Sequence, residues 1–314
     1  MAPLGAGKVG LFAAAGAGGM AYAGYFAGGG NGTTTVDRFA FSDDSRTTLS
    51  TGLSQSLRLA AGIGNAGVAG YVCGGNTSGA PDTRWDHIDK FLFTDDTRST
   101  LTATLSSTVD GGGGMSDSGT AGYVAGGNTG SYTDRVDKIL FSNDSKSTIS
   151  ATLATATGAV PAGLSNSGTA GYVAGGHTGS GTDVIDKFLF SNDTRSTLGA
   201  TLAFARWSLA GVSNSGTAGY VAGGYSPSGD KDTVDKLLFS NDTVSTLTAT
   251  LTNEVHNQAG MSNSGTAGYV GGGFVNTAVV NKLTFSGETI AALSTGLSSA
   301  TKAMTGFANS EALV

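Results

Sequence analysis

The chain contains very little cysteine and charge, and it has no long apolar run. Cys73 is its only cysteine among 314 residues, so no internal disulfide framework can form, and cysteine pairing gives no indication of the redox compartment. No apolar stretch reaches the roughly 20 residues that a membrane-spanning helix needs. Only 13% of the residues are charged, the formal net charge is -6 and no basic stripe is present. Binding to nucleic acid or to an anionic membrane through charge is therefore disfavoured.

Glycine is abundant, at 52 residues against 4 prolines. Glycine enrichment is often a sign of disorder. In this chain, however, 39% of the residues are apolar, and they fall in short, regularly placed runs such as YVAGG and KFLF. We therefore interpret the glycines as turn and close-packing residues of a folded chain that is long enough to bury a substantial core.

The N-terminus loosely imitates a secretory signal. Lys8 is followed by VGLFAAAGAGGM and then by the small-residue string AYA. Glycines break this apolar run, and the same residues align with the repeat described next. We therefore expect an uncleaved start and no signal peptide.

An internal repeat organises the whole chain. A glycine–tyrosine hairpin occurs six times at intervals of 46 to 52 residues, and a diglycine closes the strand that carries the tyrosine. From the third copy onward the unit reads, with small changes, NSGTAGYVAGG, a variable loop, VDKLLFSNDT, STLTATL and a second variable loop. The six tyrosines are Tyr25, Tyr71, Tyr123, Tyr172, Tyr220 and Tyr269.

Each unit predicts four short strands. In the fifth copy we expect them at 210–216, 218–224, 234–239 and 245–251, the last two with the period-two alternation of a half-buried strand. A tight Ser-Gly-Thr turn joins the first two strands. Asn and Asp suit the SNDT turn, because their side chains bond the backbone just ahead and tolerate left-handed geometry. An Asp-Lys or Asp-Arg pair opens the third strand in five copies, and we expect its Asp to bond backbone in a neighbouring strand or blade.

Four-stranded units repeated around a ring are typical of β-propeller blades. The unit resembles the kelch repeat in its length and in its diglycines, although Phe-Ser-Asn-Asp replaces the aromatic-Asp-Pro turn, and leucine or isoleucine replaces the tryptophan of the fourth strand. The repeat and the resemblance imply an all-β, six-bladed β-propeller of four-stranded kelch-like blades, forming a single domain over residues 1–314. Segments resembling the first strand occur at both chain ends. We expect the N- and C-terminal strands to pair and close the ring, and which segment does so stays open.

The two faces of such a ring differ in how much they vary between copies. Because strand direction alternates, the first-to-second and third-to-fourth turns lie on one face, which is nearly identical from copy to copy and is called the uniform face below. The other loops form the variable face, which collects aromatic and arginine residues that commonly anchor protein or sugar ligands. The alternative to a binding face is that these loops vary in sequence without a function and that each tryptophan packs under its own loop. The candidate binding residues are Arg84, Trp85, His87, Tyr132, His177, Phe204, Arg206, Trp207, Tyr225, Glu254 and His256, with Asn257 beside the last.

No catalytic residue, metal or cofactor is predicted. The three histidines fall in different repeats, and Asp110 and Glu254 are isolated acids. Each SNDT turn offers one or two carboxylates, whereas calcium needs 6 to 8 oxygens, so Asx-turn chemistry explains these turns better than a calcium site. The acids in these turns are Asp44, Asp96, Asp144, Asp193 and Asp242.

These observations lead us to expect a non-enzymatic recognition or assembly module. Near-identical copies, sparse charge and abundant Gly, Ser, Thr and Asn are similar to the repeat proteins of bacteriophage tails and other virion or cell-surface structures. The first hypothesis is therefore a virion protein of the tail or of host adsorption, with a protein partner in a larger assembly. The alternatives are a secreted propeller that binds or processes a surface glycan, and an intracellular kelch-type adaptor. None of the three involves nucleic acid or membrane insertion.

Overall fold

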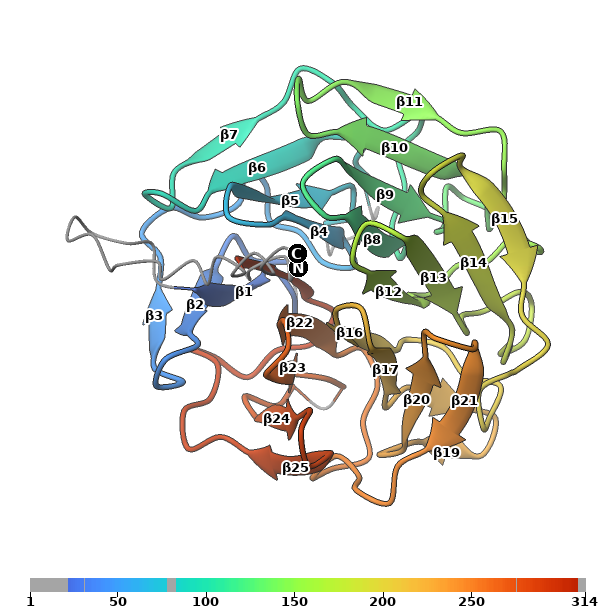
Figure 1. The fold of residues 1–314 in the computed structure, drawn as a ribbon. Helices are drawn as coiled ribbons and strands as arrows, with labels where there is room; N and C mark the ends of the chain where they lie inside the picture. The colour runs from blue at the N-terminus through green and yellow to red at the C-terminus, as the bar shows by residue number, and fades with distance from the viewer. Residues whose placement is uncertain (1–21, 31, 78–82, 275, 310–314) are drawn as a thin grey trace, which may run out of the picture.

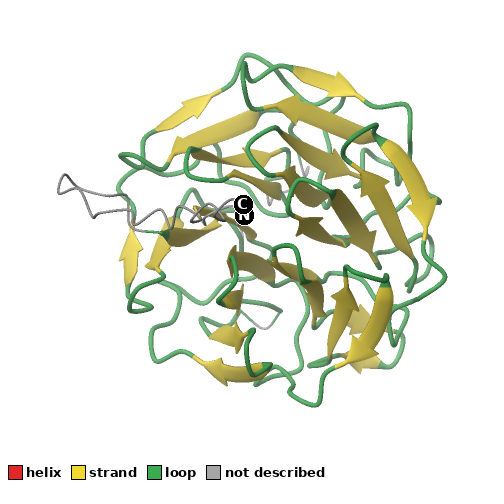
Figure 2. Ribbon diagram, in the orientation of Figure 1, coloured by secondary structure: helices red, strands yellow, loops and turns green. Residues whose placement is uncertain are grey.

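The structure is a computed structural model that describes residues 22–30, 32–77, 83–274 and 276–309. The secondary structure of these residues is all β, and six four-stranded antiparallel sheets stand around a central axis as the blades of a propeller (Figures 1 and 2). The predicted all-β, six-bladed propeller of four-stranded blades is therefore confirmed. No helix in these ranges is long and apolar enough to cross a membrane.

The blades follow one another along the chain, and each runs from an innermost strand at the axis to an outermost strand at the edge of the disc. Blade I consists of β26 (Thr305–Asn309), β1 (Ala23–Ala27), β2 (Val36–Ala40) and β3 (Arg46–Thr48), and blade II of β4 (Ala61–Asn65), β5 (Ala69–Cys73), β6 (Ile88–Leu92) and β7 (Arg98–Thr100). Blade III consists of β8 (Gly113–Asp117), β9 (Ala121–Ala125), β10 (Val136–Leu140) and β11 (Lys146–Thr148), and blade IV of β12 (Ala162–Asn166), β13 (Ala170–Ala174), β14 (Ile185–Leu189) and β15 (Thr194–Thr197). Blade V consists of β16 (Ala210–Asn214), β17 (Ala218–Ala222), β20 (Val234–Leu238) and β21 (Thr243–Thr246), with the small hairpin β18 (Tyr225–Ser226) and β19 (Gly229–Asp230), and blade VI of β22 (Ala259–Asn263), β23 (Ala267–Gly271), β24 (Val280–Thr284) and β25 (Thr289–Ala292).

Blade I joins the two ends of the described chain. Its innermost strand is β26, which pairs antiparallel with β1 so that Ala23 lies opposite Asn309. The C-terminal segment TGFAN therefore supplies the strand for which the sequence offered two candidates. The N-terminal candidate and the signal-like run both lie outside the described residues.

The outermost strand is shorter and earlier than predicted. In blade V the expected strand 245–251 is wrong beyond Thr246, where β21 ends. The chain then leaves the sheet, Leu251 is buried in the core between blades V and VI, and its backbone N–H donates to the carbonyl of Asp232 at 2.8 Å. The alternating Thr and Leu of this segment thus place a leucine in that core without continuing the sheet.

Adjacent blades are joined by a contact that we call the tyrosine latch. Tyr71 is fully buried between blades II and III, stacks on Phe141 at 5.2 Å and donates its hydroxyl to Asp144 at 2.9 Å. Lys90 donates to the same carboxylate at 2.7 Å. All six blade junctions repeat this arrangement, with Arg38 in place of the lysine in blade I and Glu288 in place of the aspartate in blade VI.

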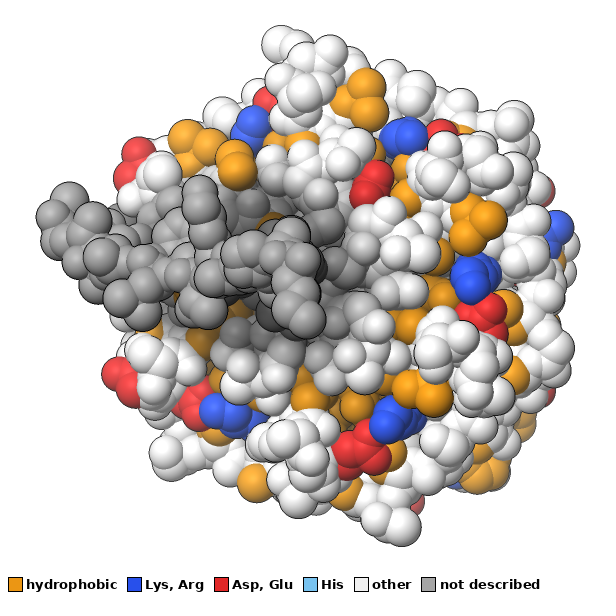
Figure 3. All heavy atoms as spheres, viewed as in Figure 1, with side chains coloured by type: hydrophobic (Ala, Val, Ile, Leu, Met, Phe, Trp, Pro, Cys, Tyr) orange, Lys and Arg blue, Asp and Glu red, His pale blue; other side chains and the backbone are white. Residues whose placement is uncertain are grey.

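The carboxylates of the SNDT aspartates, on the uniform face, therefore already accept hydrogen bonds from side chains of the same chain. Asp144 has the left-handed backbone that the sequence predicted, with a φ of 55°, and Asn143 accepts the N–H of Ser145 in an Asx turn. Figure 3 looks onto this face, where acidic and basic side chains lie next to one another around the ring. These carboxylates neutralise neighbouring lysines, and Asx-turn geometry accounts for the turn residues themselves.

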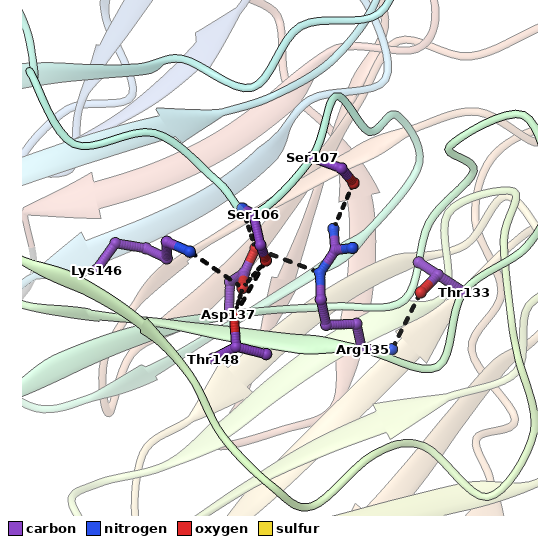
Figure 4. A network of polar contacts seen from close by, with 7 residues as sticks. All are labelled: Ser106, Ser107, Thr133, Arg135, Asp137, Lys146 and Thr148. Atoms are coloured by element: carbon purple, nitrogen blue, oxygen red, sulfur yellow. Dashed lines mark hydrogen bonds and ion pairs between the residues drawn. The ribbon is translucent and has the colours of Figure 1, made fainter.

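A second contact, the aspartate latch, ties each blade to the loop before it. Asp137 on β10 accepts the backbone N–H of Ser106 at 2.9 Å and the hydroxyl of Thr148 at 2.7 Å (Figure 4). Lys146 and Arg135 lie within 4 Å of the same carboxylate. The expectation that this repeated Asp bonds backbone in a neighbouring blade is confirmed. The equivalent acceptors are Asp37, Asp89, Asp186, Asp235 and Asn281.

The central axis is narrowed by a ring of six glycines, one on each innermost strand. A Cβ atom on Gly163 would lie 1.9 Å from the carbonyl oxygen of Gly114, and the other five meet their neighbour in the same way at 2.1 to 2.3 Å. Only glycine permits this approach of backbones. On the uniform-face side lies a cavity of about 170 Å³ lined by serines, and on the variable-face side one of about 70 Å³. The ring consists of Gly62, Gly114, Gly163, Gly211, Gly260 and Gly306.

Candidate functional site

Six pairs of residues, one per blade, stand around the axial cavity on the variable face. In each pair, the residue just after the diglycine bonds through its backbone to a residue shortly before the innermost strand, as in Trp207 and Tyr225, with N···O distances of 2.8 and 3.0 Å. Residues that follow the second members along the innermost strands line the 70 Å³ cavity. We call this set, together with Tyr132, Arg84 and Asp230, whose side chains contact it, the rim. Its pairs are Gly30–Lys302, Asn76–Arg58, Asn128–Asp110, His177–Gly158, Tyr225–Trp207 and Phe274–His256.

Half of the rim carries a continuous chain of rings, the aromatic arc. Each ring contacts the next, with centroids 4.5 to 5.5 Å apart, and most neighbouring planes cross steeply, as preferred by aromatic pairs. Lys302 closes the series 4.3 Å above the ring of Phe274. The members in order are Tyr132, His177, Trp207, Tyr225, His256 and Phe274.

Local backbone and hydrogen bonds hold the arc in place. Gly158 leaves room for the ring of Tyr132, since a Cβ there would meet that ring at 2.3 Å. His177 accepts the N–H of Gly179 at its Nδ1, and His256 Nδ1 lies 2.7 Å from a carboxylate oxygen of Asp230. The rings are therefore pre-oriented, which lowers the entropy that a ligand would have to remove.

The other half of the rim is a network of planar polar groups, the polar arc. Asn76 donates to Asp110 at 2.6 Å and accepts from Arg58 Nε at 2.9 Å, while Arg84 Nε donates to Asp110 at 3.1 Å. Burial raises the pKa of Asp110, and Arg84 and Asn76 oppose that rise. The guanidinium, amide and carboxylate groups hold one another in fixed directions, and they include both donors and acceptors.

The structure brings together most of the residues predicted from sequence, but not all of them. Five lie in the aromatic arc and Arg84 lies in the polar arc. Trp85 and His87 instead pack on each other at 5.1 Å, and Trp85 is half-buried against the core between blades I and II, as the alternative of packing under its own loop expected. Phe204 lies apart under Lys231, and Glu254 is exposed in the loop before β22.

Arg206 is a correction to the predicted site. The structure contradicts its assignment to the exposed face, because its side chain is fully buried. Its guanidinium donates to the carbonyls of Gly223 and Thr233 and forms an ion pair with Asp235 at 2.8 Å. It points into the blade because the next residue, Trp207, points out of it, as successive residues of an extended segment do. Arg206 is therefore a structural residue.

Sequence reasoning missed Phe274 and Lys302 and did not connect Arg58, Asn76 and Asp110. A signal for three of these was present, because Asn76 and Phe274 occupy the same place after the diglycine as His177 and Tyr225. Asp110 pairs with the residue that follows the diglycine of blade III. A comparison of the residues at equivalent positions of the six repeats would have identified the rim.

Within the described ranges, no group of three or more His, Cys, Asp and Glu side chains is arranged to hold a metal ion. The rim's chemistry is instead that of stacking and hydrogen bonding. Its rings offer flat apolar faces, and its polar arc offers directional N–H donors held in place by the buried Asn76 and Asp110.

Comparisons with known proteins add support for the fold. No family model matches the chain, and no curated protein matches it. Among solved structures, it is similar to that of a protein named YjhT, with a TM-score of 0.62, 14% sequence identity, and coverage of 80% of this chain and 87% of that one. A likeness at this identity shows the propeller fold and nothing finer.

Proposed function

We propose that this propeller is a non-enzymatic recognition module that binds its partner through the rim on the variable face. The observation that carries the proposal is the aromatic arc, in which six rings contact one another in an unbroken series beside a polar arc. Pre-oriented aromatic and arginine groups around a concave centre are the usual anchors of recognition sites. The repeated residues of the uniform face, by contrast, are used to join the blades.

The acidic groups of the rim support a binding role. The carboxylate of Asp110 is engaged by Asn76 and Arg84, and that of Asp230 contacts His256. Both acids position neighbouring side chains of the rim. The scaffold beneath them is locked at every blade junction by two latches, which suits a protein that presents a fixed surface.

For the setting of this module we favour a virion, as a tail or host-adsorption protein, and for its lineage a kelch-like repeat. The near-identity of the blade units and the sparse charge support the first, and the closing diglycines support the second. A partner in a larger assembly, or a glycan on a cell surface, would occupy the rim.

Paired substitutions test which face binds. Tyr132 and Phe274 in the arc are 37% and 41% exposed, and Leu92 and Leu189 on the uniform face match them at 37% and 36%. The purified protein is mixed with its own native particles or cell surfaces, and bound protein is measured after sedimentation. We expect Tyr132→Ala/Phe274→Ala to reduce binding about tenfold or more, and Leu92→Ala/Leu189→Ala to leave it unchanged. Unchanged binding in Tyr132→Ala/Phe274→Ala, or loss of binding only in the leucine pair, would overturn the proposal.

A further inference from the structure

Resting on the proposed function, we propose that the ligand of the rim is a neutral carbohydrate chain. Its sugar rings would stack on the aromatic arc while vicinal hydroxyl groups bond to the polar arc. Sugars present two kinds of surface, an apolar face of C–H groups and an edge of hydroxyls. The rim offers a matching surface for each, side by side around one cavity.

The kind of apolar residue on the variable face favours a sugar over a protein partner. The large apolar side chains exposed there, in the described part of the chain, are Tyr132, Phe204 and Phe274, and all three are aromatic. On the uniform face the exposed large apolar side chains are mostly aliphatic, with Val68, Leu92 and Leu189 at turns and strand ends and Tyr22 as a single aromatic among them in the described residues. Flat π faces bind the C–H face of a sugar ring, which aliphatic side chains cannot do with the same geometry.

The polar arc fits hydroxyl groups rather than a charged group. Asp110 accepts from both Asn76 and Arg84, and Arg58 donates to the amide oxygen of Asn76. The cations are thus already bonded to an acid or an amide. Because Asn76 and Asp110 are only 3% and 6% exposed, a ligand would meet the half-buried Arg84 guanidinium, whose direction these two buried groups fix. Adjacent hydroxyls of a pyranose can accept from the paired N–H groups of such a planar guanidinium.

The aromatic arc fits a chain of several sugars better than a single one. Its six rings span four blades, and successive centroids are 4.5 to 5.5 Å apart, a step comparable with the width of a sugar ring. The central cavity of about 70 Å³ is too small to enclose a whole sugar, so the chain would lie across the rim.

The experiment is a glycan array of neutral oligosaccharides, acidic glycans and monosaccharides, followed by fluorescence titration of the hits. A Trp85→Phe background leaves Trp207 of the arc as the only tryptophan. We expect neutral oligosaccharides to bind and to change Trp207 fluorescence. Tyr132→Ala, Phe274→Ala and Arg84→Ala should each weaken binding about tenfold, whereas Phe204→Ala, which lies outside the arc, should leave it unchanged.

The outcomes separate this inference from the function on which it rests. A blank array, binding restricted to acidic glycans, or titrations unaffected by the arc variants would overturn the neutral-carbohydrate assignment. If attachment to native particles is still lost in Tyr132→Ala/Phe274→Ala, the recognition face stands and only the ligand class falls. If that attachment also persists, both fall.

Discussion

Removing the buried Arg206 is predicted to destabilise the whole propeller, because it leaves a carboxylate in the interior without its cation. The Arg206 guanidinium and the Asp235 carboxylate are 2.8 Å apart, and the two side chains are 0% and 1% exposed. Breaking such a pair by removing one partner typically costs about 3–5 kcal/mol in free energy of unfolding. With an unfolding entropy of about 2.1 cal/mol/K per residue, Arg206→Leu should lower the Tm by roughly 5–8 °C.

The repeat itself explains why blade V needs this arginine. In blades I to IV a cation on the outermost strand lies near the latch aspartate, as Arg195 does at 3.1 Å from Asp186. Val244 occupies that place in blade V, and Ile290 occupies it in blade VI, where the latch residue is the neutral Asn281. A cation is thus present wherever the latch residue is an acid.

Calorimetry of three variants checks this reasoning. Arg206→Leu/Asp235→Asn imitates blade VI and should recover most of the lost stability, to within about 1–2 kcal/mol of the parent. Arg195→Leu removes a partly exposed cation and should cost only about 1 kcal/mol. The reasoning is refuted if Arg206→Leu costs no more than Arg195→Leu, or if adding Asp235→Asn recovers nothing.

Two further perturbations address the scaffold. Gly163→Ala should cost about 1–3 kcal/mol in free energy of unfolding, because its Cβ would lie 1.9 Å from a carbonyl oxygen. The control Gly199→Ala, whose new Cβ has no atom within 4 Å, should cost nothing. Equal Tm values for the two variants would contradict the closed glycine ring. Burial, and the acid that each hydroxyl contacts, raise the pKa of all six latch tyrosines, so the folded state retains protons that the unfolded chain releases near pH 10. The stability that the protonated latch tyrosines contribute is therefore fully present below about pH 10 and should be lost as the pH rises above it. Most tyrosinate absorbance should appear only when the protein unfolds. Gradual ionisation of the latch tyrosines in the folded protein would refute the latch.

The sequence predicted the architecture well because one physical requirement recurs in every repeat. Each tyrosine must stack on the next blade and each diglycine must close a strand, so both recur at the same position in every repeat of the sequence. The strand order from axis to edge and the Asx turns follow from the same recurring positions. The outermost strand was misplaced because alternating Thr and Leu also describes a loop that buries Leu251 between two blades.

The site was predicted less completely because its residues are related by position around the ring and differ in type. His177, Trp207 and Tyr225 were found by their chemistry, but their contact depends on backbone pairing across the rim, which joins residues far apart in sequence. Arg206 was assigned to the wrong side because neighbouring residues of one short segment point in opposite directions. The signal that could have corrected it was Val244, which stands where blades I to IV carry Arg or Lys.

The most direct test of the account is electron microscopy of the protein bound to its native particle or cell surface, with the contact located on the propeller. We predict that the bound density covers the rim around Trp207 and Tyr225 and that Trp207→Ala abolishes it. Contact over the SNDT turns of the uniform face, undisturbed by Trp207→Ala, would contradict the account.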